Sequence, residues 1–390
     1  MRNKIITSFF CLLLAVSALI GLLMPDRYYS EREKRTLTQK PQFTVANFIS
    51  GEFSGELEKY LTDQVPLRDG WVTMKTYMEL AIGKRESGGV YICKDKYLMD
   101  KFTSYSKKQL AANAAALADL QEKLAAEGVS MNTILVPMAA QVLTDKLPAH
   151  APVTDYTAIL QVLTDAGVDT TDVLSALAAH SSENIYYRTD HHWTQLGAYY
   201  AYTAFCEAAG FDAVPLEQFQ TGRYDTFLGS MYTFTKGYPQ SDVLKQHPDY
   251  LDYYLPIADT HARYYADGSL ENGTPVSVVY TQLDESVSNK YLCFIGGDTP
   301  VCIVESDVQG PTCIVLKESY GNAFVPFLTS HYGRIIVIDP REFNQEGKPT
   351  LDLAAFAADQ GVDDLIVINY PYMINSKAFV RYLNALAGVK

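Results

Sequence analysis

Four short apolar segments, the last three of them followed by polar residues, constrain the fold of this chain more than any other feature. They are NTILVP from Asn132, CIVL from Cys313, RIIVID from Arg334 and DDLIVIN from Asp363. Runs of this length are typical of strands that are covered on both faces, as in parallel sheets. Helical patterns alternate with them, so the sequence predicts an α/β sheet. Ligands of such sheets bind at the carboxyl ends of the strands.

The helical patterns are clearest on either side of the first apolar segment. Residues 106–127 place four leucines on one helical stripe and end at Gly128, a residue that commonly ends helices. Further helices are expected at about 156–166 and 174–179. Residues from about 211 to 290 are rich in tyrosine and punctuated by glycine, which predicts an inserted, mostly β or irregular region. Its tyrosines either stack on sugar rings or fill a β-rich layer: Tyr224, Tyr232, Tyr250, Tyr253 and Tyr254.

The amino terminus contains an uncharged apolar run, Ile5 to Met24, preceded by Arg2 and Lys4. A helix of this length spans the hydrocarbon core of a bilayer, and the basic residues before it keep the terminus in the cytoplasm. We therefore expect a single-pass membrane anchor with the rest of the chain outside the cytoplasm. A cleaved signal peptide, which would release a secreted protein, is the alternative.

Three parts follow from these patterns. Residues 1–25 form the anchor or signal peptide, residues 26–105 a juxtamembrane linker with a helical segment, and residues 106–390 an α/β domain with the insertion at about 211–290. Within the second part, Asp63, Arg68 and Asp69 form either a docking feature or a solvated turn held by local ion pairs.

Charge and cysteine content argue against a nucleic-acid-binding protein and against a cysteine-based zinc site. The chain has 32 basic and 45 acidic residues, a formal net charge of −13, and no basic run that would bind a nucleic acid backbone. Beyond Cys11 there are five cysteines, an odd number whose spacings match no zinc site. We expect buried free thiols, with at most one adventitious disulfide: Cys93, Cys206, Cys293, Cys302 and Cys313.

Two segments concentrate residues that could carry chemistry, Thr189–Thr194 (TDHHWT) and Lys317–Asn322 (KESYGN). Ser319 follows a strand at a turn into a helix, where backbone N–H groups can stabilise an oxyanion. Asp190 and His192 are two residues apart and would face the same way on an extended segment. The three residues therefore form a candidate Ser-His-Asp constellation, in which His192 accepts the proton of Ser319.

Other interpretations of these residues stay open. Ser319 is also suited to cap a helix, and the two histidines could be structural. Asp190, His191 and His192 are plausible metal ligands, but adjacent histidines on a strand point to opposite faces and no second ligand cluster completes a shell. We expect neither a metal nor a cofactor.

The chain resembles the DHHW protein family, whose signature is the segment TDHHWTQLGAYYAY. It is also similar to the alginate O-acetyltransferase proteins, which share a T-D-x-H-W-T-x-x-G-A block and an SGNH-hydrolase-like fold. The further matching blocks run in the same order along nearly the whole chain: SEREKRTL, LTDQVPLRD, ILVPMAAQV, FIGGDTP, KESYGNAFVPFL and VIDPREF.

The resemblance implies an SGNH-like three-layer α/β/α sandwich with a parallel sheet. It selects Asp190 and His192 as triad members and Ser319 as the nucleophile. In ordinary SGNH enzymes the nucleophile serine ends a Gly-Asp-Ser motif. This chain has Lys317-Glu318-Ser319 there, so the glycine that opens the usual turn is absent. Candidate oxyanion or substrate-binding residues are therefore Gly297, Tyr320, Asn322 and Arg341. Asn369 also lies at the end of a predicted strand.

The implied function is O-acetylation of a cell-surface polysaccharide through an acetyl-serine intermediate. Because cytoplasmic acetyl-CoA cannot reach an outward-facing enzyme, the resemblance implies a membrane acyltransferase partner that supplies acetyl. Water as the acceptor would make the protein an acetylesterase. A catalytically silent module that binds glycan or scaffolds the envelope is the third alternative. The net charge of the outward-facing part favours a neutral glycan over an acidic one.

Overall fold

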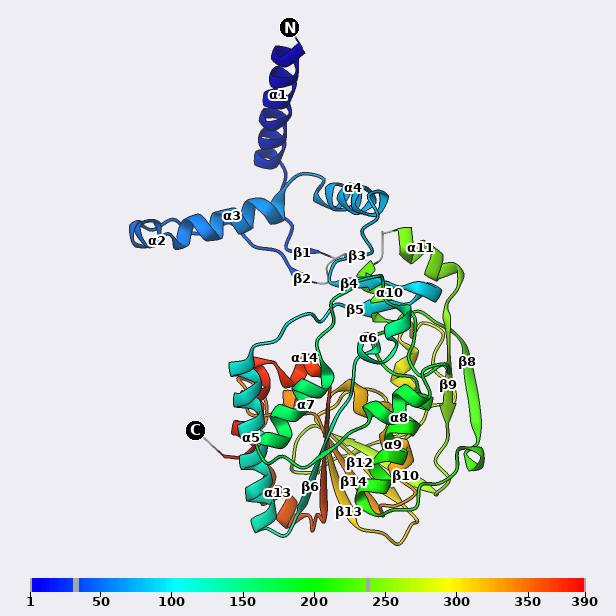
Figure 1. The fold of residues 1–390 in the computed structure, drawn as a ribbon. Helices are drawn as coiled ribbons and strands as arrows, with labels where there is room; N and C mark the ends of the chain where they lie inside the picture. Colours follow the sequence, from blue (N-terminus) through cyan, green and yellow to red (C-terminus); the bar gives the residue numbers. More distant parts are fainter. Residues whose placement is uncertain (1, 31–34, 236–238, 389–390) are drawn as a thin grey trace. The chain divides into compact units, whose positions relative to one another are not determined.

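The computed structural model describes residues 2–30, 35–235 and 239–388 (Figure 1). The chain divides into two compact units. One comprises Met1–Gly88 with Thr233–Val243, and the other comprises Gly89–Tyr232 with Leu244–Lys390. The second unit contains both segments that the sequence singled out.

An eight-stranded sheet, in the order β11-β10-β12-β14-β13-β15-β6-β7, forms the centre of the second unit. Its strands are β6 (Ser130–Leu135), β7 (Thr170–Thr171), β10 (Thr260–Tyr265), β11 (Thr274–Val276), β12 (Val301–Ser306), β13 (Thr312–Lys317), β14 (Arg334–Ile338) and β15 (Asp364–Asn369). The four predicted strands are β6, β13, β14 and β15, and they are parallel, as expected.

The expectation of a wholly parallel sheet is wrong. β12 pairs antiparallel with both β14 and β10, and β10 pairs antiparallel with β11, so the sheet is mixed. Part of the tyrosine-rich region thus extends the main sheet, since both β10 and β11 come from it. Antiparallel neighbours need no helical crossover, which is why this side of the sheet lacks the strand-helix alternation that the sequence showed elsewhere.

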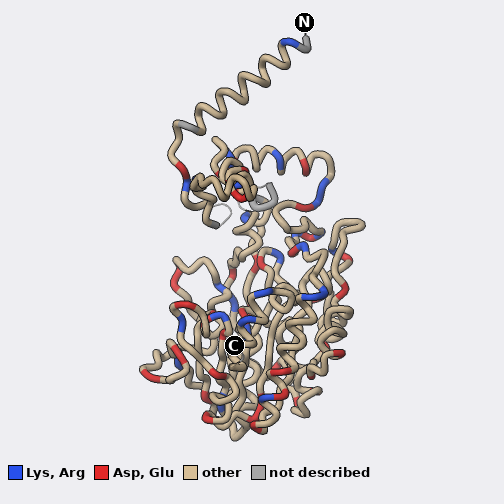
Figure 2. The backbone as a smooth tube through the Cα atoms, turned by 90° about the vertical axis from the view of Figure 1, so that its left-hand side faces the viewer, with Lys and Arg blue, Asp and Glu red and all other residues tan. Residues whose placement is uncertain are grey.

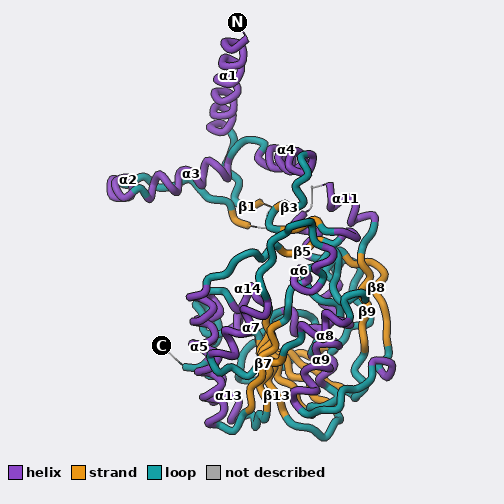
Figure 3. The backbone as a smooth tube through the Cα atoms, viewed as in Figure 1, coloured by secondary structure: helices purple, strands orange, loops and turns teal. Residues whose placement is uncertain are grey.

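Two hydrophobic cores lie on the two faces of the sheet. Cys313 and Val315 of β13 belong to one core and Ile314 and Leu316 to the other, because successive side chains of a strand point to opposite faces. On the first face pack α6 (Ala139–Val142), α8 (Leu174–Ala179), α9 (Gln195–Ala209) and α12 (Val325–Leu328). On the second pack α5 (Lys107–Ala126), α7 (Tyr156–Asp165), α13 (Leu353–Asp359), α14 (Pro371–Ile374) and α15 (Lys377–Leu386). Figure 3 shows helices around the strands.

The predicted helices are confirmed. In α5 the hydroxyl of Ser106 accepts a hydrogen bond from the backbone N–H of Gln109, and Gly128 after the helix has a φ of 82°. The predicted leucine stripe of α5 is buried in full: Leu110, Leu117, Leu120 and Leu124. α7 and α8 match the other two predictions to within a residue.

The remaining elements of the second unit are short or lie outside the main sheet. β8 (Thr221–Phe227) and β9 (Asp249–Tyr254) form a separate antiparallel ribbon, and β4 (Val90–Ile92) pairs with β5 (Leu98–Asp100). The 3₁₀ helices are η1 (Lys94–Lys96), η2 (Thr144–Lys146), η3 (Leu216–Gln218), η4 (Lys290–Cys293), η5 (Ser319–Ala323) and η6 (Pro340–Glu342). α10 (Ser230–Thr235) and α11 (Pro239–Gln246) include residues of both units.

The first unit begins with α1 (Arg2–Leu23), which is long and apolar enough to cross a membrane. Its most apolar window, Lys4–Gly21, has a mean hydropathy of 2.1 and contains no buried residue. In Figure 2, charged residues mark only the start of this helix. The helix fits the predicted anchor or signal peptide. After it come β1 (Tyr29–Ser30), β2 (Arg35–Thr36), α2 (Val45–Ser50), α3 (Glu52–Gln64), α4 (Arg68–Ala81) and β3 (Glu86–Ser87).

All six cysteines are free in the part of the chain that the structure describes. Cys206, Cys293, Cys302 and Cys313 are buried, while Cys93 is partly exposed. Burial raises the pKa of the Cys93 thiol to about 12, so this thiol is not activated by the neighbouring Lys94. The prediction of free thiols is confirmed, with Cys93 less buried than expected.

Gly197, in the first turn of α9, fixes how closely this helix approaches the segment before it. A Cβ at this position would lie 2.4 Å from the carbonyl oxygen of Ile185. We expect Gly197→Ala to lower the free energy of unfolding by about 1–3 kcal/mol, the usual cost of overpacking. The measurement is denaturant unfolding.

Gly55→Ala is the matched control, because Gly55 lies in α3 and a Cβ there meets nothing within 4 Å. Equal stability of Gly197→Ala and the unmodified chain would contradict the close approach.

Candidate active site

Asp190 and His192 are brought together by a tight bend, not by an extended segment. Asp190 Oδ1 accepts a hydrogen bond from the backbone N–H of His192 at 2.9 Å and lies 2.5 Å from His192 Nδ1. The sequence-based expectation of a strand here is wrong, because an aspartate that binds a backbone N–H two residues ahead folds the chain into an Asx turn. The turn places carboxylate and imidazole side by side.

His192 in turn reaches Ser319. Its Nε2 lies 2.7 Å from Ser319 Oγ. Since the carboxylate of Asp190 accepts the proton of Nδ1, the other ring nitrogen is free to accept the serine proton. Both Asp190 and His192 are buried, and the His192 ring stacks on Tyr291 with centroids 4.1 Å apart. Packing and two hydrogen bonds therefore fix the orientation of the imidazole.

Ser319 is placed by the end of β13. This strand ends at Lys317, and η5 begins at Ser319, so the serine lies at the carboxyl edge of the sheet. It does not cap this helix: the residue before η5 is Glu318, whose side chain accepts the backbone N–H of Tyr320. The predicted strand-to-helix turn is confirmed, but Glu318, not Ser319, fills the capping role.

Asp190 stays ionised despite its burial. Burial by itself raises the pKa of this carboxyl, but the adjacent His192 and His191 and the hydrogen bonds from His192 and from the backbone N–H of Ser230 outweigh it. The pKa is held well below its usual range. A carboxylate in this state stabilises an imidazolium next to it.

His191 faces the same region as His192. The two rings lie 3.8 Å apart, so the expectation that adjacent histidines point to opposite faces is wrong for this bent segment. His191 Nδ1 lies 2.6 Å from Ser230 Oγ, and burial lowers the pKa of its imidazole to about 4. Ligand atoms of Asp190, His191 and His192 all lie within 4.8 Å of one another. Both ring nitrogens of His192 are already hydrogen-bonded, which fits a proton relay better than a metal site.

Four residues were predicted to bind an oxyanion or substrate near the Ser319 turn. Several of their N–H donors already make hydrogen bonds to other groups of the protein. The backbone N–H of Gly297 donates to Phe294 O at 3.1 Å, and that of Tyr320 to Glu318 Oε2 at 3.1 Å. Asn322 Nδ2 donates to Asp298 Oδ1 at 3.1 Å. Arg341 uses Nε and Nη2 on Asp298 and Asp339.

Asn369 differs from these residues. It is the last residue of β15. The residue before it, Ile368, pairs with Lys317, the last residue of β13, so Asn369 lies next to the turn that carries Ser319. Its side chain is buried, and among the described residues neither amide atom has a hydrogen-bond partner. An unengaged buried amide at this edge is a donor that an oxyanion could use.

A charged network lies beneath the turn. Lys317 Nζ and Arg341 Nη2 each lie 2.6 Å from a carboxylate oxygen of Asp298. Despite its burial, which opposes ionisation, Asp298 has a lowered pKa because Lys317 and Arg341 stabilise its charge. Lys317 is almost fully buried, so this ion pair anchors the end of β13.

Glu318 is a buried carboxyl beside the serine. Its Oε2 lies 3.2 Å from Ser319 Oγ, and its Oε1 has no partner among the described residues. Burial raises the pKa of Glu318 to about 8. A neutral carboxyl is a weaker acceptor than a carboxylate, so near pH 7 it leaves the serine proton to His192.

Sequence reasoning missed three contributors: Gly229, Ser230 and Tyr291. Ser230 donates its backbone N–H to Asp190 Oδ2 at 2.6 Å, and a Cβ on Gly229 would lie 2.2 Å from the same oxygen. Tyr291 provides the ring that stacks on His192. All three lie far from Asp190 and His192 in the chain, and no local pattern connects them to the motif.

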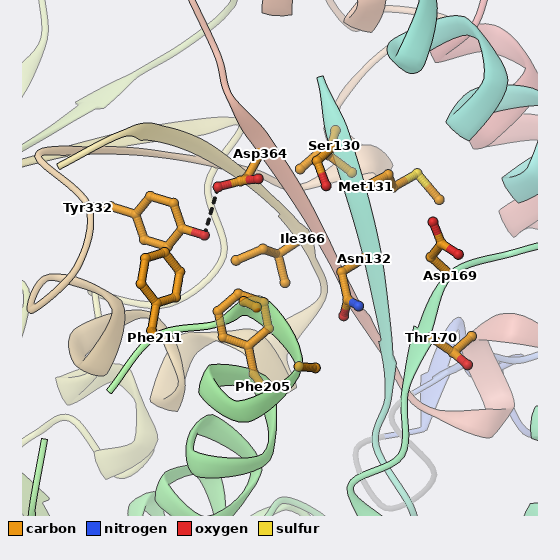
Figure 4. Close-up of a pocket in the computed structure, with 13 residues that line it drawn as sticks. Ser130, Met131, Asn132, Asp169, Thr170, Phe205, Phe211, Tyr332, Asp364 and Ile366 are labelled. Carbon is orange, nitrogen blue, oxygen red and sulfur yellow. Dashed lines mark hydrogen bonds between the residues drawn. The ribbon is translucent and has the colours of Figure 1, made fainter. Parts of the chain in front are cut away.

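A separate cavity of about 460 Å³ lies elsewhere on the sheet (Figure 4). Its walls include Ser130 and Asp364, the first residues of β6 and β15, and Tyr332, which donates a hydrogen bond to Asp364 at 3.1 Å. Because β13 and β15 are parallel, this cavity is at the amino edge of the sheet, opposite the edge that carries Ser319.

Solved structures share the fold of about three quarters of this chain. A DHHW family protein from Eubacterium siraeum matches 78% of this chain and 96% of its own, with 26% identity and a TM-score of 0.63. Bacillus cereus PatB1 matches 75% of this chain and 96% of its own, with 17% identity and a TM-score of 0.59. The second likeness concerns the fold alone.

The model of the DHHW protein family matches residues 85–338, which is more than half of the chain, and the chain belongs to this family. Two relatives described as probable alginate O-acetylase AlgJ are 23% identical over 254 residues (Pseudomonas syringae pv. tomato) and 24% identical over 236 residues (Pseudomonas aeruginosa). These matches cover 61% and 55% of this chain. They span 64% and 59% of the relatives' own lengths, less than two thirds.

The raised pKa of Glu318 predicts a pH-dependent stability. The folded protein keeps this proton up to about pH 8, whereas an unfolded glutamate releases it near pH 4.3, so stability falls as pH rises through this window. Glu318→Gln cannot release a proton, and we expect its free energy of unfolding to fall less between these pH values. Denaturant unfolding at several pH values measures this difference.

Glu305→Gln is the matched control, because Glu305 is an exposed carboxyl on β12. If the free energy of unfolding fell equally with pH in the unmodified chain and in Glu318→Gln, the pKa of Glu318 would not be raised by folding, and the prediction would be wrong.

Proposed function

We propose that this protein is an acyl-transfer enzyme that O-acetylates a cell-surface polysaccharide outside the cytoplasm, with Ser319, His192 and Asp190 as its catalytic triad. One observation carries the proposal: His192 lies 2.7 Å from Ser319 Oγ through one ring nitrogen and 2.5 Å from Asp190 through the other. This is the arrangement that activates a serine. No metal or cofactor takes part in the proposed reaction.

In the first half-reaction, Ser319 Oγ attacks the carbonyl carbon of an acetyl donor and passes its proton to His192 Nε2. The tetrahedral intermediate collapses, the bond to the donor oxygen breaks, and the imidazolium returns the proton to that leaving group. Asp190, ionised and buried, stabilises the imidazolium. The product is an acetyl ester on Ser319.

In the second half-reaction, a sugar hydroxyl gives its proton to His192 and attacks the acetyl carbon. The bond to Ser319 Oγ breaks, and the serine takes the proton back. Asn369 Nδ2 is our choice for an oxyanion donor, because it is buried without a partner at this edge. Tyr320, Asn322, Gly297 and Arg341 remain candidates whose donors must leave their present partners or act through other atoms.

The descriptions of the relatives support transfer over hydrolysis, because both are named probable alginate O-acetylases. An outward-facing enzyme anchored by α1 would receive acetyl from a membrane acyltransferase partner. An acetylesterase would use the same triad with water as the acceptor. A silent glycan-binding or scaffold module would not need a serine within hydrogen-bond reach of a buried histidine.

The triad predicts turnover of an activated ester. We expect the protein to hydrolyse a chromogenic acetyl ester, and Ser319→Ala and His192→Ala each to lower the rate about 10³-fold or more, since either change removes the activated nucleophile. Release of the chromophore measures the rate. Because the structure of PatB1 carries a sulfonyl adduct, a sulfonyl fluoride is the matching covalent probe, and mass spectrometry should locate it on Ser319.

Ser288→Ala is the control, because Ser288 is an exposed serine outside the site. Equal turnover and equal labelling in Ser319→Ala and the unmodified chain would remove the triad. Labelling of Ser319 without ester hydrolysis would favour a dedicated transferase over an esterase.

The charge of the second unit predicts the acceptor. The whole excess of acidic residues lies in residues 89–390, and like charges repel an acidic polymer. We expect a neutral polysaccharide to accept acetyl more readily than a uronic-acid polymer at low salt. Transfer of labelled acetyl to each polymer measures this preference, and a strong preference for the polyanion would contradict it.

A further inference from the structure

Exposed large apolar side chains are concentrated in the first unit. Outside α1, those in the described part of the chain lie almost entirely in residues 24–82, and the exceptions are Phe234, Val243, Ile257 and Tyr372. Phe234 and Val243 themselves belong to the first unit. The second unit, although several times larger, buries its apolar side chains well. A surface this apolar on one small unit marks an interaction site.

Most of the large apolar residues exposed on α4 form one stripe. Trp71, Met74 and Met78 follow at spacings of three and four residues, which places them on one helical face. Exposed Leu67 and Ile82 flank the two ends of the helix, and exposed Tyr77 lies beside the stripe. Leu67 is 79% exposed and Ile82 is 85% exposed. Lys75, four residues after Trp71 and three before Met78, borders this stripe and pairs with Glu79. The exposed face of α4 is thus mainly apolar.

On α2 and α3 the exposed residues line an apolar groove of about 480 Å³. Its walls include Phe48 of α2, a row on α3 formed by Phe53, Leu57 and Leu61, and Val65 after that helix. Phe43 packs against Phe48 and Phe53 at 5.9 and 5.2 Å between ring centroids. The groove is open and suits a flexible hydrocarbon chain.

Two observations favour a lipid bilayer as the occupant. The surface follows directly on α1, the one described helix that can span a membrane, so these helices begin next to the bilayer. Residues 26–88 contain as many basic as acidic residues, so the strongly acidic character of the chain is absent here. Trp71, Tyr28, Tyr29 and Tyr77 are exposed as well, and tryptophan and tyrosine favour the membrane interface.

We infer that α2, α3 and α4 lie in the outer membrane-water interface, with the α4 stripe and the α2–α3 groove in contact with lipid acyl chains. The inference rests on the membrane anchoring in the proposed function. Interfacial helices of this kind bury one apolar face among headgroups and acyl chains while their polar face stays in water. Lipid contact would hold the segment between anchor and enzyme against the membrane.

The two tryptophans of the chain allow a direct test. Trp71 belongs to the α4 stripe, whereas Trp193 is fully buried in the second unit. The full-length chain is reconstituted in phosphatidylcholine/phosphatidylglycerol vesicles with or without brominated acyl chains, which quench tryptophan on contact. We expect the brominated lipid to remove most of the Trp71 emission, obtained as the difference between the unmodified chain and Trp71→Phe. The remaining Trp193 emission should not change.

Variants of the stripe sharpen the result. Met74→Gln with Met78→Gln makes the stripe polar and should reduce quenching of Trp71. Lys59→Gln, an exposed lysine on the face of α3 away from Leu57 and Leu61, should leave it unchanged. Circular dichroism confirms that the helices are retained.

A chain that floats with the vesicles while Trp71 stays unquenched overturns the inference and assigns the stripe to a protein partner or a second copy. A chain that does not float overturns both anchoring and inference. Neither readout depends on acetyl transfer, so a failure of the enzyme reaction is seen separately.

Discussion

The buried carboxylate of Asp190 is the interaction on which the candidate active site depends. It accepts hydrogen bonds from the backbone N–H of His192 and from that of Ser230, and it contacts His192 Nδ1. These bonds fold the TDHHWT segment into a turn, tie it to a residue forty positions further on, and fix the tautomer of the imidazole. A charged group that is almost fully buried is stable only when it is satisfied in this way.

The sheet supplies the other half of the site. β13 delivers Ser319 to the carboxyl edge, and the ion pairs of Asp298 with Lys317 and Arg341 hold the end of that strand. Tyr320 links the two halves, because its carbonyl accepts the indole N–H of Trp193 and its hydroxyl donates to the carbonyl of His191. The tryptophan of the DHHW motif is therefore a structural contact that positions the histidine against the serine turn.

Much of the fold follows from local patterns. Strands β6, β13, β14 and β15 are short apolar runs, and α5 has a cap, a leucine stripe and a terminal glycine, so sequence periodicity identifies them. The antiparallel half of the sheet was not predictable in this way, because β10 is rich in polar and tyrosine residues and β11 is only three residues long, so neither shows which strand it pairs with. Pairing of strands distant in the chain depends on packing, which a local pattern does not contain.

For the candidate site, the sequence by itself determined the residue types and their positions in the chain: Asp190 and His192 in one short motif, and Ser319 at the end of a strand. Only the tertiary structure decided how they meet. The carboxylate turns the chain instead of extending it, Glu318 takes the helix cap, and Gly229 leaves room for Ser230 to reach Asp190. The reason is physical: hydrogen-bond distances of 2.7 and 2.6 Å across 127 and 40 residues of chain arise only when the sheet and its two cores fix the segments that carry them.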